Sequence, residues 1–114
     1  MLARLMGLKI ISPDALHRLA QNREPVTVVG FNSRQSWTKA RVPGAKNLDS
    51  ATYDESDLPT DKSAFLVFYC SGPMCRKAPN AARRAEELGY SNVQVMSAGI
   101  SGWLAARLPI ESGA

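Results

Sequence analysis

The segment with the clearest potential for chemistry is the run Cys-Ser-Gly-Pro-Met-Cys-Arg at residues 70–76. The apolar run Ala64–Tyr69 before it predicts a buried central strand, and Pro79–Leu88 after it predicts a helix. Loop N–H groups and the positive end of that helix attract anions, and the guanidinium of Arg76 suits oxyanions. Such surroundings favour a nucleophilic thiolate at Cys70; the alternative is a strand-end thiol that packs as a small hydrophobic residue.

Cys70 is expected to act without a histidine base. The only histidine, His17, falls in a helix predicted over residues 13–21, which Ser12 caps and Pro13 begins. Two cysteines and one histidine are also too few for the four ligands of a structural metal site. We therefore expect neither a metal nor an organic cofactor.

The loop residues between Cys70 and Arg76 have separate expected roles. Gly72 and Pro73 supply tight curvature, and the Ser71 hydroxyl could donate a hydrogen bond to the thiolate. Met74 either lines the substrate mouth or packs against the protein. Cys75 is interpreted as a packed thiol that anchors the loop. The alternative is a resolving cysteine, which requires the two Cα atoms to lie within ~7 Å.

Strands and helices are expected to alternate along the chain. Besides residues 64–69, strands are predicted at 9–11, 26–29, 46–48 and 92–96, and besides residues 13–21 and 79–88, helices at 34–39, 51–58 and 100–106. This order is typical of a three-layer α/β/α sandwich with a central, mostly parallel sheet of about five strands. Ligands of such sheets bind outside the carboxyl ends of the strands, which is where Cys70 is expected.

Length and composition favour one globular domain over residues 1–114. The net charge of +4 suits small anions as partners, and without a base-reading motif we expect no nucleic-acid partner. No apolar run is long enough to span a bilayer, and residues 1–11 lack the features of a signal peptide. These observations favour a cytoplasmic protein without a membrane partner.

The chain resembles a single rhodanese-like domain over nearly its whole length. The order and spacing of several pieces carry this resemblance: Val26–Val29 as a buried strand, Val42-Pro43-Gly44-Ala45 at the family's I-P-G-A turn, Phe68-Tyr69-Cys70 before the active loop, Leu88-Gly89-Tyr90, Asn92-Val93, and Ala98-Gly99-Ile100 with Trp103 and Leu108-Pro109. The resemblance implies a sulfurtransferase of the thiosulfate:cyanide type. Its cysteine would take a sulfane sulfur from an anionic donor, hold it as a persulfide, and pass it to a thiol, cyanide-like or protein acceptor.

Two family features are absent from this sequence. Gly30 and Asn32 replace the Asp and Arg of the D-x-R pattern, and Arg41 stands at the position of the usual His. Arg34 or Arg41 could replace the lost positive charge as auxiliary residues; the alternative is that both lie on the surface.

The loop from Cys70 to Arg76 is one residue longer than most sulfurtransferase loops of the family. A longer loop resembles those of cell-cycle phosphatases and arsenate reductases, so a cysteine-based phosphatase or arsenate reductase remains an alternative. One of Asp54, Glu55 and Asp57 would then be sought as a general acid. A third alternative is a non-catalytic binding or regulatory module.

Overall fold

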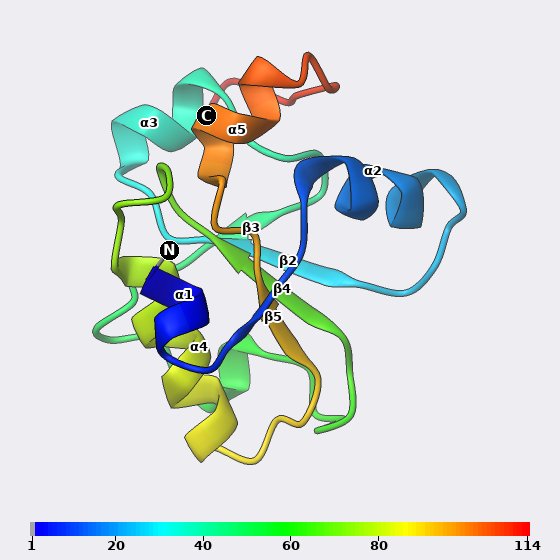
Figure 1. Ribbon diagram of the computed structural model, residues 1–114. Coiled ribbons are helices and arrows are strands. Elements are labelled where there is room, and N and C mark those ends of the chain that lie inside the picture. Colours follow the sequence, from blue (N-terminus) through cyan, green and yellow to red (C-terminus); the bar gives the residue numbers. More distant parts are fainter. Residues whose placement is uncertain (1) are drawn as a thin grey trace.

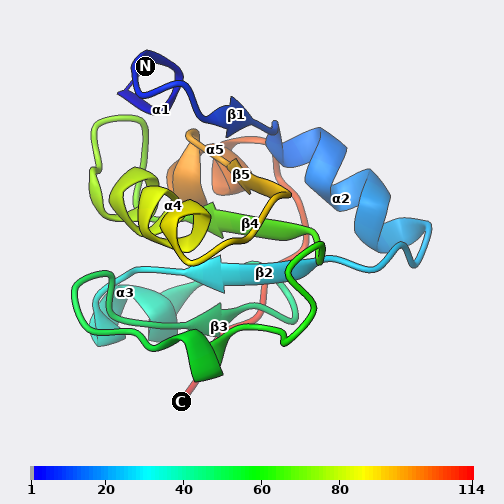
Figure 2. The same cartoon turned by 90° about the horizontal axis from the view of Figure 1, so that it is seen from below.

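The computed structural model describes residues 2–114, and its centre is a five-stranded sheet in which all neighbouring strands are parallel. The strand order is β1-β5-β4-β2-β3, and Figure 2 shows this succession across the sheet. The strands are β1 (Lys9–Ile10), β2 (Thr27–Gly30), β3 (Lys46–Asn47), β4 (Leu66–Tyr69) and β5 (Val93–Val95). β4 is the central strand, as its apolar sequence predicts.

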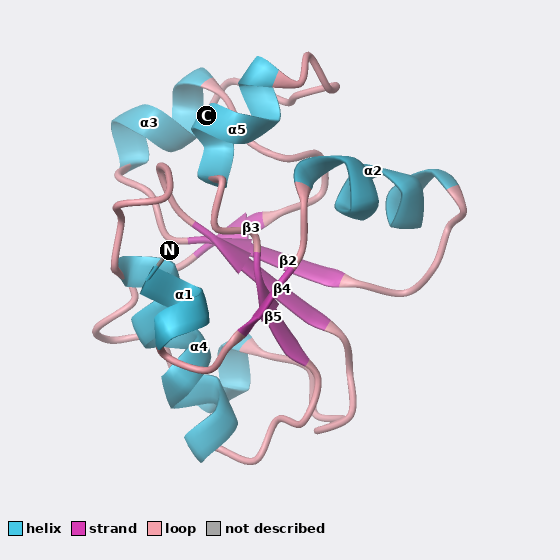
Figure 3. Cartoon of the chain, in the orientation of Figure 1, coloured by secondary structure: helices cyan, strands magenta, loops and turns pink. Residues whose placement is uncertain are grey.

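Helices cover both faces of the sheet, which confirms the predicted α/β/α layering (Figures 1 and 3). α1 and α4 lie over one face, and α2 and α5 lie over the other, with α3 beside α5. The helices are α1 (Leu2–Leu5), α2 (Pro13–Gln21), α3 (Arg34–Lys39), α4 (Lys77–Glu87) and α5 (Gly99–Ala105), with a 3-10 turn, η1, at Glu55–Asp57.

Alternation along β4 decides which side chains enter each core. Leu66 and Phe68 point toward the α1/α4 side, while Val67 and Tyr69 point toward the α2/α5 side. All four are fully buried, because β4 is covered on both faces and flanked by β2 and β5. Cys70 continues the alternation and therefore falls on the α4 side.

The apolar face of α4 is built from alanines at helical spacing. Ala78, Ala81, Ala82 and Ala85 are all buried against the sheet. Their small side chains allow the helix axis to approach the sheet closely. This packing fixes the beginning of α4 next to the end of β4.

Several predicted boundaries differ from the structure. The helix expected at residues 51–58 is only the 3-10 turn η1, which Asp54 caps by accepting a hydrogen bond from the Glu55 N–H. α4 begins at Lys77, two residues before the predicted Pro79, because proline is tolerated within the first turn of a helix. The strand predicted at residues 64–69 is shorter at its start, since β2 and β5 pair with it only from Leu66 onward.

The turn that begins at Val42 is attached to the central strand by one buried hydrogen bond. The Val42 N–H donates to the Tyr69 hydroxyl at 3.2 Å. Burial raises the pKa of Tyr69, so this phenol is neutral at ordinary pH. The contact links the turn to the strand that carries Cys70.

Tyr69→Phe is expected to lower the free energy of unfolding by about 1–3 kcal/mol, because it leaves the buried Val42 N–H without an acceptor. Urea denaturation of the two proteins measures the difference. Tyr90→Phe is the control for loss of a phenol, because the Tyr90 hydroxyl donates to the only partly buried Pro59 carbonyl. Equal stability of Tyr69→Phe and the unchanged protein would show that the bond does not hold the turn.

Candidate functional site

Cys70 lies where the central strand ends and faces the beginning of α4. The Ala78 N–H, in the first turn of α4, donates a hydrogen bond to the Cys70 Sγ at 3.4 Å. The positive end of the helix is therefore directed at this sulfur. Cys70 is only 4% exposed, so little water competes for the sulfur. This is the arrangement that the sequence predicts for a stabilised thiolate.

The beginning of the loop is attached to α5. The Ile100 N–H donates to the Cys70 carbonyl at 2.9 Å, and the Ser101 N–H donates to the Ser71 carbonyl at 3.0 Å. Gly99 makes this close approach feasible. Its φ is +67°, and an added Cβ would lie 2.5 Å from the Gly72 nitrogen and 2.7 Å from the Cys70 carbonyl oxygen. Only glycine meets both requirements without a shift of the backbone.

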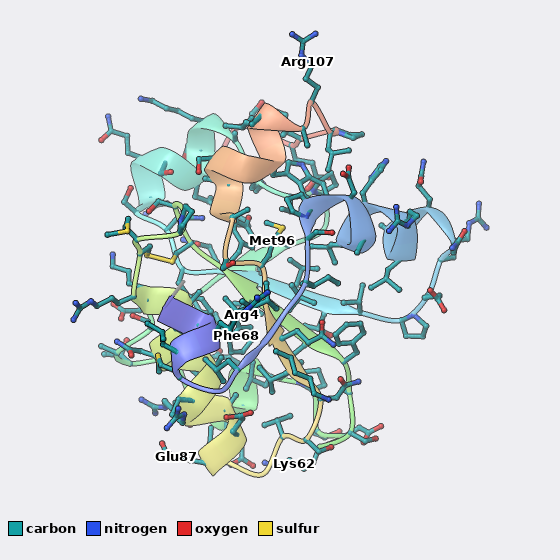
Figure 4. All side chains as sticks on the ribbon, in the orientation of Figure 1. Arg4, Lys62, Phe68, Glu87, Met96 and Arg107 are labelled. Atoms are coloured by element: carbon teal, nitrogen blue, oxygen red, sulfur yellow. A yellow bond between two sulfur atoms is a disulfide. The ribbon has the colours of Figure 1, made fainter. Side chains whose placement is uncertain are left out.

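Cys75 forms a disulfide with Cys70, seen as the yellow bond near the beginning of α4 in Figure 4. The expectation that Cys75 is a packed free thiol is therefore wrong. A turn closed by the Cys75 N–H, which donates to the Gly72 carbonyl at 3.1 Å, folds the loop back on itself. As a result the two Cα atoms lie 6.3 Å apart, within the range that a disulfide spans.

Most of the remaining loop groups are free to meet a ligand. Within residues 2–114, the N–H groups of Ser71, Gly72, Met74 and Arg76 have no hydrogen-bond partner. The Arg76 side chain is exposed and likewise makes no ion pair in this part of the chain. Backbone amides without a partner can bind an anion, and the exposed Arg76 guanidinium adds a positive charge at the end of the same loop.

Two expectations for loop side chains have different outcomes. Met74 is 91% exposed, so the alternative in which it packs against the protein is wrong. In the described part of the chain no hydrogen bond joins the Ser71 hydroxyl to the Cys70 sulfur. The role suggested for that hydroxyl stays a prediction for the reduced protein.

Arg34 and Arg41, the two arginines considered as auxiliary residues, lie in different parts of the structure. The Arg41 guanidinium donates to the carbonyls of Gly113 and Trp37 and lies over the Trp37 ring. It therefore holds the C-terminal segment, and the role proposed for it at the loop is wrong. Arg34 lines an open cavity of about 370 Å³ together with Lys77, the first residue of α4. Of the two, only Arg34 lies near the end of the loop.

The carboxylates considered as general acids are engaged elsewhere. Asp54 and Asp57 form a reciprocal capping box around η1, and Glu55 pairs with Lys62 at 2.8 Å. Tyr53, beside η1, is buried against Phe68, and this burial raises its pKa to about 12. These groups stabilise the segment before β4 and offer no proton donor to the loop.

The free space around the disulfide is small. A cavity of about 10 Å³ lies there, and apart from Ser97 its walls are apolar side chains and loop backbone, without a carboxylate. A larger, mostly apolar cavity of about 470 Å³ lies on the other face of the sheet, between α2, the Val42 turn and Trp103. Cys70 does not line it, so it is separate from the cysteine loop.

Residues 2–114 contain neither a metal-binding cluster nor a membrane-spanning helix. No group of three or more His, Cys, Asp or Glu side chains is placed to hold a metal ion. No helix in the described chain has the length and apolar character needed to cross a bilayer.

Comparison with known families identifies the family of this chain. The family model of the rhodanese-like domain matches residues 12–106, which include every strand except β1 and the whole cysteine loop. The chain belongs to the rhodanese-like domain family. The resemblance noted in the sequence is thereby confirmed.

Two relatives of this rhodanese-like domain are longer proteins. It is 33% identical over 107 residues to the HTH-type transcriptional regulator Rv0324 of Mycobacterium tuberculosis, covering 89% of this chain but only 46% of the regulator. It is 29% identical over 111 residues to the uncharacterized protein YibN of Escherichia coli, covering 93% of this chain and 74% of YibN. The chain thus spans less than half of the regulator.

Solved structures agree on the fold. The BH2092 protein of Bacillus halodurans superposes with a TM-score of 0.82 at 21% identity, over 96% of this chain and 80% of that one. The protein RPA3614 of Rhodopseudomonas palustris, a protein of unknown function and possible tyrosine phosphatase, gives 0.77 at 19% identity, over 96% and 88%. At these identities the similarity shows a common fold, and it carries no information about a common activity.

Sequence reasoning missed two contributors to the site. The first is the Ala78 N–H. It is a backbone group, so no sequence motif can reveal it. The second is Gly99, to which the sequence assigns no role beyond its place in the Ala98-Gly99-Ile100 piece of the family resemblance. Gly99 begins α5, the element that follows β5, and β5 pairs with β4. This order is the signal that could place Gly99 near Cys70.

Proposed function

We propose that this rhodanese-like domain is a sulfurtransferase that carries a sulfane sulfur on Cys70. The observation that carries the proposal is the contact between the Cys70 sulfur and the Ala78 N–H at the beginning of α4. Once the disulfide is reduced, this contact favours the thiolate over the thiol. The nucleophile is thus activated without histidine.

The transfer proceeds in two displacements. The Cys70 thiolate attacks the outer sulfur of thiosulfate; the sulfur–sulfur bond of the donor breaks, and sulfite leaves with the electron pair. The persulfide anion on Cys70 then lies among the free N–H groups of Ser71, Gly72 and Met74, which stabilise its charge. An acceptor such as cyanide or a thiolate attacks the outer sulfur and restores the Cys70 thiolate.

Leaving-group chemistry favours sulfur transfer over phosphate-ester hydrolysis. Sulfite departs as a stable anion without a proton, whereas the alkoxide released from a phosphate ester requires a general acid. The cavity beside Cys70 has no carboxylate in its walls, and Asp54, Glu55 and Asp57 are engaged at η1. The longer loop and the possible phosphatase among the structural neighbours keep phosphatase activity as the second candidate.

A non-catalytic role is the third candidate, because one relative is a transcriptional regulator. Catalysis needs Cys70, which contacts the beginning of α4, and Arg76, whose exposed guanidinium makes no ion pair within residues 2–114. Their presence supports a catalytic domain, and we expect the partners to be a small anionic sulfur donor and a thiol or cyanide-like acceptor.

A cyanolysis assay tests this function. The protein is reduced, freed of reductant without air, and incubated with thiosulfate and cyanide, and thiocyanate is measured. In parallel, the same protein is given a chromogenic phosphate monoester, and phosphate release is measured. Thiocyanate without phosphate is the expected result. The Cys75→Ser variant, which cannot close the internal disulfide, is assayed alongside. Phosphate release without thiocyanate would favour the phosphatase over sulfur transfer. Neither product from either protein would favour the regulatory module.

Arg76→Ala is expected to raise the KM for thiosulfate about 10-fold, because it removes one charge-assisted contact worth about 1.5 kcal/mol or more. Steady-state cyanolysis over a range of thiosulfate concentrations measures the change. Arg107→Ala removes an equal charge from the end of α5, where Arg107 projects into solvent (Figure 4). Equal KM values for the two variants would show that Arg76 does not bind the donor.

A further inference from the structure

The loop holds a second sulfur that the sulfur transfer described above does not use. Cys75 is half-buried and bonded to Cys70, five residues earlier. Residues 70–75 are fixed at both ends, because the Cys70 carbonyl is bound by the Ile100 N–H and α4 begins two residues after Cys75. A thiol at Cys75 is therefore held beside Cys70 at high effective concentration.

The disulfide form is incompatible with holding a donor. The Cys70 sulfur is then bonded to Cys75, and the adjoining cavity of about 10 Å³ has room for about one water molecule. Thiosulfate and a persulfide both need more space than this. The Cys70–Cys75 disulfide must therefore be reduced before Cys70 can accept another sulfur.

We propose that Cys75 resolves the Cys70 persulfide, so that the domain releases sulfide and ends the half-reaction as the disulfide seen in the structure. This inference rests on the proposed function, since the persulfide must form first. The Cys75 thiolate attacks the Cys70 Sγ, the bond between that sulfur and the outer sulfur breaks, and the outer sulfur leaves as hydrosulfide. The sulfane sulfur is the oxidant in this step, and the two cysteines are the reductant.

The cycle closes with a dithiol, either a small molecule or a protein. The dithiol reduces the Cys70–Cys75 disulfide by thiol–disulfide exchange and becomes a disulfide itself. Over the cycle, thiosulfate and one dithiol give sulfite, hydrosulfide, one proton and the oxidised dithiol. The substrate class that follows is an anionic sulfane-sulfur donor with a dithiol reductant. When no external acceptor takes the sulfane sulfur, the net reaction is a reduction of the donor.

Loop geometry supports attack by Cys75 over attack by an external thiol. The Cα atoms of the two cysteines lie 6.3 Å apart, and the turn from Gly72 to Cys75 holds that separation. Residue Cys70 is only 4% exposed, so bulky acceptors reach its sulfur less easily than a thiol in the same loop does. The Ala78 N–H also remains beside the sulfur that is attacked.

A single-turnover experiment separates this step from the first one. Reduced protein and its Cys75→Ser variant are each treated, without air or added thiol, with one equivalent of thiosulfate. Sulfite, sulfide and the mass of the intact chain are measured. We expect the unchanged protein to release one sulfite and one sulfide per chain and to lose the mass of two hydrogen atoms. We expect Cys75→Ser to release sulfite, no sulfide, and to gain the mass of one sulfur atom.

The outcomes distinguish the two proposals. If neither protein releases sulfite, the proposed function fails. If both release sulfite and both keep the added sulfur atom, sulfur transfer stands and the resolving role of Cys75 is overturned. Sulfide from Cys75→Ser equal to that from the unchanged protein also overturns it. Cys75→Ala, which lacks a hydroxyl, is measured alongside, and circular dichroism confirms that each variant is folded.

Discussion

Cys70→Ser is expected to reduce thiocyanate formation at least about 10³-fold, to the level of the uncatalysed reaction, because removal of a covalent nucleophile eliminates both displacements. A serine hydroxyl at this position would accept the Ala78 N–H bond, but it stays protonated and cannot form a persulfide. Cyanolysis rates of the reduced proteins, normalised to the concentration of folded protein, provide the measurement.

Loss of the disulfide must be separated from loss of the nucleophile. Cys75→Ser breaks the same disulfide and keeps Cys70, so it should retain measurable thiocyanate formation. If Cys70→Ser and Cys75→Ser lose activity equally, the disulfide itself, or another nucleophile, accounts for the effect. If Cys70→Ser keeps full activity, Cys70 is not the sulfur carrier.

Gly99→Ala is expected to lower the free energy of unfolding by about 3 kcal/mol or more and to reduce cyanolysis about 10²-fold. A left-handed conformation costs a non-glycine residue about 1–3 kcal/mol, and crowding in a packed region costs a similar amount. The new methyl group would lie 2.5–2.7 Å from backbone atoms of Cys70, Ser71 and Gly72, so the loop must move. Displacement of a reacting group by about 1 Å accounts for the loss of rate.

Gly7→Ala is the control for backbone conformation alone. Gly7 has a φ of +77°, close to that of Gly99, but an added Cβ meets no atom of residues 2–114 within 4 Å. We expect this variant to lose about 1 kcal/mol of stability and no activity. Thermal unfolding and cyanolysis of both variants check the prediction. Equal effects of the two substitutions would show that contact with the loop does not matter.

The fold could be predicted where its determinants are local in sequence. The apolar run before Cys70 is buried on both faces as the central strand, and Ser12 caps α2 through a hydrogen bond from the Ala15 N–H. Gly89, with a φ of +102°, follows the end of α4 as expected. The exception is residues 51–58, whose polar composition predicts a helix. Only three residues form the 3-10 turn, since the two buried apolar residues of the segment, Tyr53 and Leu58, are not spaced to share one helical face.

The site could be predicted only in part, since some of its members meet across the fold. The sequence placed Cys70 at the end of a strand and a helix after it, and α4 does begin directly after Arg76. It did not indicate the destination of Arg41, whose guanidinium reaches Gly113, 72 residues away. A long side chain can reach several partners, and the chain path alone decides which of them is near.

By itself the sequence determined the alternation of strands and helices, the parallel sheet, and the position of Cys70 between β4 and α4, because periodicity and helix caps depend on neighbours in the chain. Only the tertiary structure decided that Cys75 reaches Cys70 and that Gly99 lies against the loop. These contacts depend on how the Gly72–Cys75 turn bends and on the pairing of β4 with β5, which brings α5 to the loop. Distances across a fold are properties of the packed chain, and no local pattern encodes them.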